Sequence, residues 1–139
     1  NRGIVLVNNI HKRGRRLGLD IFKSAREELP LDLYGMGWEQ VGGVSELPHA
    51  QLPFVCAQYR FLYNPIRYTS LGLSIVEAMM VGLPIIGLAT TELVTVIENE
   101  VTGFLSLKPN ELVHVAKELL ADEGLAHKWG KNSRELAQE

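Results

Sequence analysis

The chain contains 139 residues, of which 46% are hydrophobic and 22% are charged, and its formal net charge is −2. These values are typical of one globular domain with a hydrophobic core of its own. No apolar run approaches the roughly 20 residues of a membrane-spanning helix, and a single cysteine, Cys56, excludes an internal disulfide. Because the sequence opens on a strand-like run without an initiator methionine, we expect it to be one part of a longer protein.

Charge is distributed unevenly along the chain. Residues 1–70 contain nine Lys and Arg against six Asp and Glu, whereas residues 71–139 contain five against ten. The basic excess is concentrated in the turn His11–Arg16, which is too short and too poor in aromatic residues for a nucleic-acid surface. The turn would suit a phosphate-bearing small ligand or an anionic membrane surface. We therefore expect no nucleic-acid partner, and a cytoplasmic protein that uses this turn either for a ligand or for peripheral membrane contact.

Apolar β-branched runs predict strands, and apolar residues at helical spacing predict helices. In chain order, the predicted strands are residues 3–7, 31–34, 40–44, 60–63, 85–88 and 103–105. The predicted helices are residues 17–29, 51–58, 73–81, 91–97, a segment through 120 that is capped by Asn110, and 123–138. Strands that alternate with helices predict an α/β fold with a parallel sheet and helices on both faces. Ligands of such sheets bind beyond the carboxyl ends of the strands.

The most informative segment is the run from Arg67 to Gly87. It begins as a loop, Ser70-Leu71-Gly72-Leu73, and then enters the predicted helix that carries Glu77. Backbone amides at the start of a helix favour an anion, because they are unpaired and the helix dipole is positive there. Glu77, about one turn further, could accept hydrogen bonds from sugar hydroxyls, although an ordinary solvated helix acid fits the same pattern. Phosphate next to hydroxyls describes a nucleotide sugar.

Three arginines are candidate phosphate ligands. Arg67 precedes Thr69 and the amide loop, so we expect it to clamp phosphate, because guanidinium groups bind phosphate oxygens through two parallel hydrogen bonds. Arg15 and Arg16 lie in the basic turn, and the pattern is equally compatible with a phosphate contact by one of them and with a solvated surface.

Metal and dinucleotide sites are not indicated. The four histidines, His11, His49, His114 and His127, lack metal-ligand spacing, so we expect no metal and no cofactor. Gly35-Met36-Gly37 lacks the third glycine of a dinucleotide fingerprint, which argues against a dehydrogenase module.

The same residues resemble a known family, the retaining GT-B glycosyltransferases of the family 4 type, in their C-terminal half. The resemblance is carried by Asn64-Pro65, Ser70-Leu71-Gly72-Leu73, Val76-Glu77-Ala78-Met79, Gly82-Leu83-Pro84-Ile85-Ile86, Glu92 and Val101-Thr102-Gly103-Phe104. It continues through Leu119-Leu120-Ala121-Asp122 and Trp129-Gly130 and is weaker over residues 4–37. The resemblance implies a Rossmann-like domain, one half of a GT-B fold, over residues 1–139, with the N-terminal acceptor domain absent from this chain.

The resemblance also implies roles for single residues. The second of two family glutamates contacts the nucleotide ribose, and it falls on Glu77. Amides of the loop before its helix bind the diphosphate, and they fall on Ser70, Leu71, Gly72 and Leu73.

Four family positions are occupied by other residues here. The first glutamate, which touches the donor sugar, is replaced by Thr69, and a phosphate-binding lysine is replaced by Leu17. A glycine-arginine pair after the first strand corresponds to Asn8-Asn9. Arg15, Arg16 and Arg67 are the residues that could supply the positive charge instead.

The expected function is transfer of a hexose from a nucleotide diphosphate-sugar to an acceptor hydroxyl. Arg67 would stabilise the leaving diphosphate without a metal, and the acceptor site would lie in the missing domain, so the isolated chain should bind nucleotide but not transfer sugar. Because Thr69 and Leu17 depart from the family pattern, a non-catalytic nucleotide-sugar-binding or scaffolding domain is the alternative.

Overall fold

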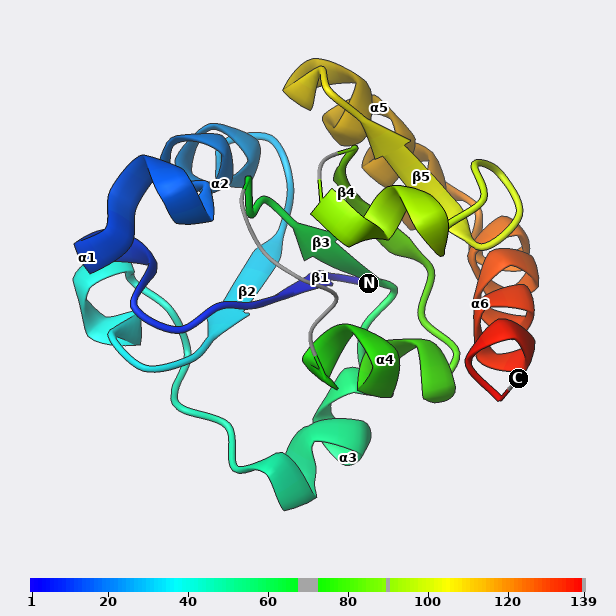
Figure 1. Cartoon of the computed structure of the whole chain (residues 1–139), viewed down its shortest axis with the longest axis horizontal. Helices are drawn as coiled ribbons and strands as arrows, with labels where there is room; N and C mark the ends of the chain where they lie inside the picture. Colours follow the sequence, from blue (N-terminus) through cyan, green and yellow to red (C-terminus); the bar gives the residue numbers. More distant parts are fainter. Residues whose placement is uncertain (68–72, 90, 139) are drawn as a thin grey trace.

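The computed structural model describes residues 1–67, 73–89 and 91–138. Its centre is a sheet of five parallel strands in the order β2-β1-β3-β4-β5 (Figure 1). The strands are β1 (Gly3–Leu6), β2 (Leu31–Tyr34), β3 (Phe61–Asn64), β4 (Ile85–Leu88) and β5 (Gly103–Ser106). Residues of β3 and β4 are buried throughout, whereas those of β2 and β5 alternate between buried and half-buried. This difference arises because central strands of a parallel sheet are covered on both faces.

Helices cover both faces of the sheet, as predicted. On one side α2 (Leu19–Arg26) and α5 (Pro109–Ala121) pack over a core that includes Phe22, Tyr63 and Leu112. On the other side α3 (Leu52–Cys56) and α4 (Leu73–Met80) pack over a second core that includes Ile75 and Met79. Figure 1 shows these pairs on opposite sides, with α6 (Glu123–Ala137) beyond β5 and α1 (Ile10–Arg13) near α2. The fold is therefore the predicted Rossmann-like α/β arrangement.

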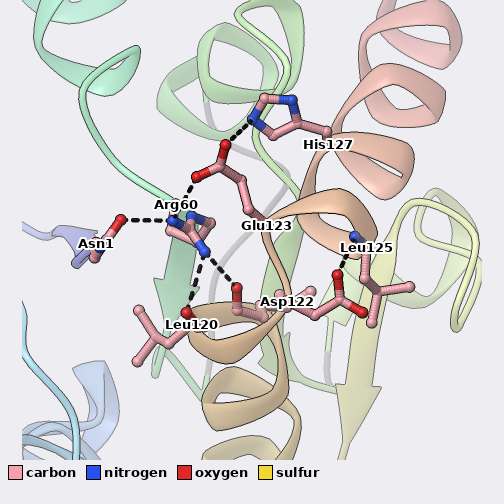
Figure 2. A network of polar contacts seen from close by, with 8 residues as sticks. Asn1, Arg60, Leu120, Asp122, Glu123, Leu125 and His127 are labelled. Atoms are coloured by element: carbon pink, nitrogen blue, oxygen red, sulfur yellow. Dashed lines mark hydrogen bonds and ion pairs between the residues drawn. The ribbon is translucent and has the colours of Figure 1, made fainter.

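Arg60, immediately before β3, joins the last two helices to the sheet (Figure 2). Its guanidinium donates to the backbone oxygens of Leu119 and Leu120 at 2.9 and 3.2 Å and to Glu123 Oε2 at 3.2 Å. A cation is stabilised at the end of a helix, where carbonyl oxygens lack intrahelical partners. Asp122 caps the start of α6 by accepting from the Leu125 amide at 3.0 Å.

Two predicted elements are wrong in type. Residues 40–44 do not form a strand: residues Trp38–Val41 form a 3-10 helix that ends at Gly42, whose φ of +67° interrupts an extended run. An isolated bridge between Tyr34 and Ser45 and a hydrogen bond from the Val44 amide to the Leu33 carbonyl join this segment to β2. The helix predicted at 91–97 is a 3-10 helix over Thr91–Thr95, in a stretch of β-branched residues whose restricted side chains disfavour an α-helix.

Two predicted helices begin elsewhere. The helix predicted from residue 17 begins at Leu19, because Gly18 has φ +80°, and the basic turn before it is helical itself, as α1 and a 3-10 helix over Gly14–Leu17. Asn110 lies inside α5, which begins at Pro109 after Lys108. Proline is favoured at the first helical position because its missing N–H would be unpaired there.

Candidate functional site

A cavity of about 370 Å³ lies at the carboxyl ends of β1 and β2 and the start of α4. From β1 the chain first adds β2 on one side of the sheet and then crosses to add β3 on the other side. The strand order therefore changes direction between β1 and β3, and ligands of open α/β sheets bind at such a switch point. The lining residues are Leu6, Val7, Asn8, Tyr34, Gly35, Leu47, His49, Leu52, Leu73 and Ser74. The cavity is thus on the side of the sheet where we expect a ligand to bind.

Glu77 lies next to this cavity through its contact with His49. Glu77 Oε1 is 3.3 Å from His49 Nε2, and the side chains are 22% and 64% exposed. The negative charge of Glu77 is also felt by Cys56: burial first, and then this charge, raise the pKa of the Cys56 thiol to about 11. Glu77 is therefore a partly buried carboxylate with a polar partner in a lining residue of the cavity, and not an acid on an open helix face.

The ends of β1 and β2 are held together by the two asparagines after β1. Asn8 Oδ1 accepts from the Met36 amide at 2.8 Å, and the Asn9 amide donates to the Met36 carbonyl at 2.6 Å. A glycine is required at position 35, after the end of β2, because its φ is +148° and a Cβ there would lie 2.0 Å from the Val7 carbonyl oxygen. The glycine loop thus shapes the cavity wall by close backbone contact.

Tyr34 is fixed in the cavity wall by a chain of hydrogen bonds across β2. Its hydroxyl lies 2.8 Å from that of Tyr59, which donates to Asp32 Oδ2 at 2.7 Å, and Arg2 donates to Asp32 Oδ1 at 2.8 Å. Burial opposes the charge on Asp32, but the hydrogen bonds from Arg2 and Tyr59, with the charge of Arg2, outweigh it and lower the pKa of this carboxyl. The network makes the position of the Tyr34 ring depend on an ionised aspartate.

Asn64, the last residue of β3, has a side chain that is 4% exposed. Its amide nitrogen has no hydrogen-bond partner among the described residues. A buried polar group without a partner is uncommon in native proteins and is often explained by a ligand or an ion. It lies at the carboxyl edge of the sheet, where ligands of this fold class bind.

Arg67, the predicted phosphate clamp, is engaged with Asp20 of α2. Its two terminal nitrogens donate to the two carboxylate oxygens at 2.7 and 2.8 Å, and one of them also donates to the Arg15 carbonyl at 2.8 Å. These hydrogen bonds from Arg67 lower the pKa of Asp20.

The other predicted site residues fall into two groups. Arg15, Arg16 and Leu73 are exposed, and Leu17 packs against the hydrophobic core, so the position of the family lysine supplies no charge here. Thr69, Ser70, Leu71 and Gly72 lie outside the described residues.

Sequence reasoning missed His49, Asp20 and Asn64. In the sequence, His49 is one of four histidines without metal-ligand spacing, Asp20 has no feature that marks it, and Asn64 belongs only to the family pattern. His49 and Asp20 reach their partners only when segments 28 and 47 residues apart meet in the fold, and no periodicity records such contacts.

Comparison with known proteins identifies the family. Residues 36–136 match the model of the glycosyl transferases group 1. Because this match covers most of the chain, the chain belongs to that family.

Solved structures share the fold. Sucrose-phosphate synthase from Thermosynechococcus elongatus superposes with a TM-score of 0.80 at 24% identity, over 99% of this chain and 40% of that protein. HepE from Anabaena, in complex with UDP, gives 0.76 at 16% identity, over 99% and 44%. The C-terminal domain of LpcC, a group 1 family protein of Francisella tularensis, gives 0.73 at 15% identity, over 99% and 84%.

This chain therefore spans less than half the length of the synthase and of HepE. Within the described ranges, no helix is long and apolar enough to cross a membrane.

Proposed function

We propose that residues 1–139 are the C-terminal, donor-binding domain of a retaining GT-B glycosyltransferase of the family 4 type. The proposal extends the family membership, which indicates glycosyl transfer, to one half of the enzyme and one stereochemical class. The match to LpcC supports the placement, because that structure is of a C-terminal domain and is covered over 84% of its length. The synthase and HepE, covered over 40% and 44%, leave room for a second domain.

The observation that carries the proposal is the position of Glu77. A partly buried carboxylate, held 3.3 Å from His49 at the wall of the cavity, can accept hydrogen bonds from both ribose hydroxyls of a nucleotide. Charge-assisted hydrogen bonds of this kind are about twice as strong as neutral ones. The base would then enter the cavity between Tyr34, Leu47 and Leu52. HepE, with UDP or UDP-glucose bound, supports a uridine nucleotide as the first donor to test.

Sugar transfer breaks the bond between the anomeric carbon and the diphosphate oxygen, and forms a bond to the acceptor oxygen, which loses its proton. Negative charge grows on the leaving diphosphate, and fixed positive charge stabilises it. The exposed Arg15 and Arg16, in the turn that the Arg67 amide contacts after β3, are the residues that we assign to this charge. Residues 70–73 and Thr69 remain the proposed contacts to diphosphate and donor sugar on sequence grounds.

We also propose that an acceptor-binding domain of the same protein faces these strand ends. It would exclude water from the cleft and orient the acceptor hydroxyl. The chain alone should bind a nucleotide sugar without transferring the sugar. The exposed basic turn would also suit peripheral contact with an anionic membrane surface from the cytoplasm.

One observation favours a non-catalytic binding domain as the second candidate. Leu17 packs against the core, so the family lysine has no counterpart in place, and Thr69 replaces the acidic residue expected on the donor sugar. Such a domain would hold a nucleotide sugar without stabilising its departure.

Calorimetric titration of the chain with UDP, GDP, ADP, TDP and their sugars tests the binding proposal. We expect saturable binding of one nucleoside diphosphate, and no binding of any would refute it. Donor turnover by the full-length protein then separates the two candidates: transfer supports the enzyme, and binding without transfer across many acceptors supports the non-catalytic domain.

A further inference from the structure

The contact between Arg67 and Asp20 joins two segments that both reach the carboxyl edge of the sheet. Arg67 follows β3 by three residues, and Asp20 lies in the first turn of α2. The two guanidinium terminal nitrogens donate to one carboxylate oxygen each, at 2.7 and 2.8 Å. The Arg67 side chain is 20% exposed and the Asp20 side chain is 52% exposed, so the pair is half open to solvent, and its two-pronged geometry is what distinguishes it from a weak surface pair.

The backbone around this pair is packed as closely as the side chains. The Arg67 amide donates to the Arg16 carbonyl at 3.2 Å, and the Arg67 side chain donates to the Arg15 carbonyl at 2.8 Å. A Cβ at Gly18 would lie 2.0 Å from the Pro65 carbonyl oxygen. The turn at residues 15–18 therefore lies directly on the segment 65–67.

Arg67 and the two arginines of the turn differ in what their charges face. The charge of Arg67 is met by Asp20. Arg15 and Arg16 have exposed side chains and no ion pair among the described residues. A charge that is already paired contributes little net attraction to an anion, because the opposite charge of its partner cancels most of its field, whereas an unpaired charge is not cancelled in this way.

We propose that Asp20 and Arg67 are a positioning pair: they hold the turn at residues 15–18 so that Arg15 and Arg16 face the phosphates, and Arg67 does not itself bind phosphate. This inference rests on the proposed nucleotide binding and changes the role that the sequence predicts for Arg67. It makes Asp20, an acid that would repel phosphate on its own, a residue that supports phosphate binding.

Asp20→Asn distinguishes the two roles of Arg67 by the sign of its effect. If the pair positions the turn, loss of the Asp20 charge loosens the turn and weakens the nucleoside diphosphate by about tenfold, within the range of coupled residues. The affinity for the matching nucleoside should stay unchanged, because it has no phosphate. If Arg67 binds phosphate directly, Asp20 competes for it, and Asp20→Asn leaves the affinity unchanged or increases it. Either of those results overturns the inference.

The controls separate positioning from general damage. Glu28→Gln removes another ion pair that follows the same helix, to Lys117 at 3.0 Å, and should leave both affinities as in the wild type. Equal losses for diphosphate and nucleoside in Asp20→Asn would show a structural role alone and would overturn the inference. The double change Asp20→Arg with Arg67→Asp should recover affinity over Arg67→Asp alone. A folded double variant without recovery would overturn the inference, and if that variant does not fold, Asp20→Asn decides.

The experiment also keeps the two proposals apart. If the wild-type chain binds no nucleoside diphosphate, the proposed function fails, and this inference fails with it. If the wild type binds and Asp20→Asn binds as well or better, only the inference fails.

Discussion

Replacement of Glu77 by glutamine is the sharpest test of the site, because it removes one charge and keeps the shape of the side chain. Glu77 Oε1 lies 3.3 Å from His49 Nε2 and the carboxylate is 22% exposed. Its hydrogen bonds to ribose hydroxyls would therefore form in partly dehydrated surroundings. A hydrogen bond to a charged group contributes about 1.5–3 kcal/mol, so Glu77→Gln should weaken a nucleoside diphosphate about 10- to 150-fold.

The comparison between ligands identifies what Glu77 binds. Inorganic pyrophosphate has no ribose, so its affinity in Glu77→Gln should differ from the wild type by less than about twofold. Both affinities can be measured by calorimetric titration of the same preparation. Equal losses for the two ligands would refute the ribose assignment, because the carboxylate would then act on phosphate or on the fold.

A matched control shows whether loss of a histidine contact alone has this effect. Glu118 on α5 lies 3.0 Å from His114 Nε2, in the same chemical pairing as Glu77 and His49 but far along the chain from the cavity residues. Glu118→Gln should leave the nucleotide affinity unchanged. Because the Glu118 pair is exposed, its loss should also change the free energy of unfolding by no more than about 1 kcal/mol.

Three further predictions concern the parts that position the site. Gly18→Ala should lower the free energy of unfolding by more than about 1 kcal/mol, because the added Cβ would lie 2.0 Å from the Pro65 carbonyl oxygen. The loss should exceed that of Gly14→Ala, where φ is +57° but nothing lies within 4 Å of the added Cβ. Equal losses in urea unfolding would contradict the packing argument. Asp32→Asn should lower the free energy of unfolding near neutral pH but not in acid. The pKa of Asp32 in the folded protein lies below the ordinary value of 3.8, so the stability from its ionised form is present above that value and is lost as the pH falls through the folded pKa. A difference in free energy of unfolding between variant and wild type that does not vary with pH would contradict this prediction. Asn64→Leu should leave the ligand-free protein at least as stable as the wild type, because it removes a buried amide without a partner among the described residues. The same change should weaken nucleotide binding if that amide donates to the ligand. A loss of several kcal/mol in thermal unfolding would instead show that the amide has a structural partner.

The sheet could be predicted from the sequence because its signals are local. Five of the six predicted strands are present, and the runs at 31–34 and 85–88 agree with β2 and β4 to the residue. Apolar, β-branched runs that are bounded by glycine or proline predict such strands with little help from tertiary contacts. The strand predicted at 40–44 contains Gly42 and Gly43. Gly42 has a positive φ, which is incompatible with the extended backbone of a strand.

The helix boundaries show where local signals compete. The basic turn and the residues just after it contain two glycines with positive φ, Gly14 and Gly18, yet the residues between them form helical turns. Glycine at these positions ends one short helix and begins the next, as expected of a residue that adopts left-handed backbone at little cost. The charge pattern predicts only a basic turn here, because charge carries no information on backbone conformation.

The side of the sheet that carries the site could be predicted, but its pairings could not. Strand direction places the segments after β1, β2, β3 and β4 at one edge, so the alternation of strands and helices is sufficient for that step. Which side chains meet there depends on how two crossovers pack against each other. Gly18 lets the chain approach Pro65, and only this approach brings Asp20 to Arg67.

The pairings change how charges near the site should be interpreted. In the sequence, Arg67 is a cation beside an amide loop, and no pattern marks Asp20 for a role in the site. In the fold, Arg67 and Asp20 form an ion pair, and the hydrogen bonds from Arg67 are the largest influence on the pKa of Asp20, so we infer that the positive charge available to an anion at this edge lies on Arg15 and Arg16. For Glu77 the fold strengthens the assignment to the site. The sequence pattern is also compatible with a solvated surface acid, but the contact with His49 places Glu77 beside the cavity. A site of this kind is therefore defined by which charges remain unpaired after folding, and a count of charged residues near a motif does not give that answer.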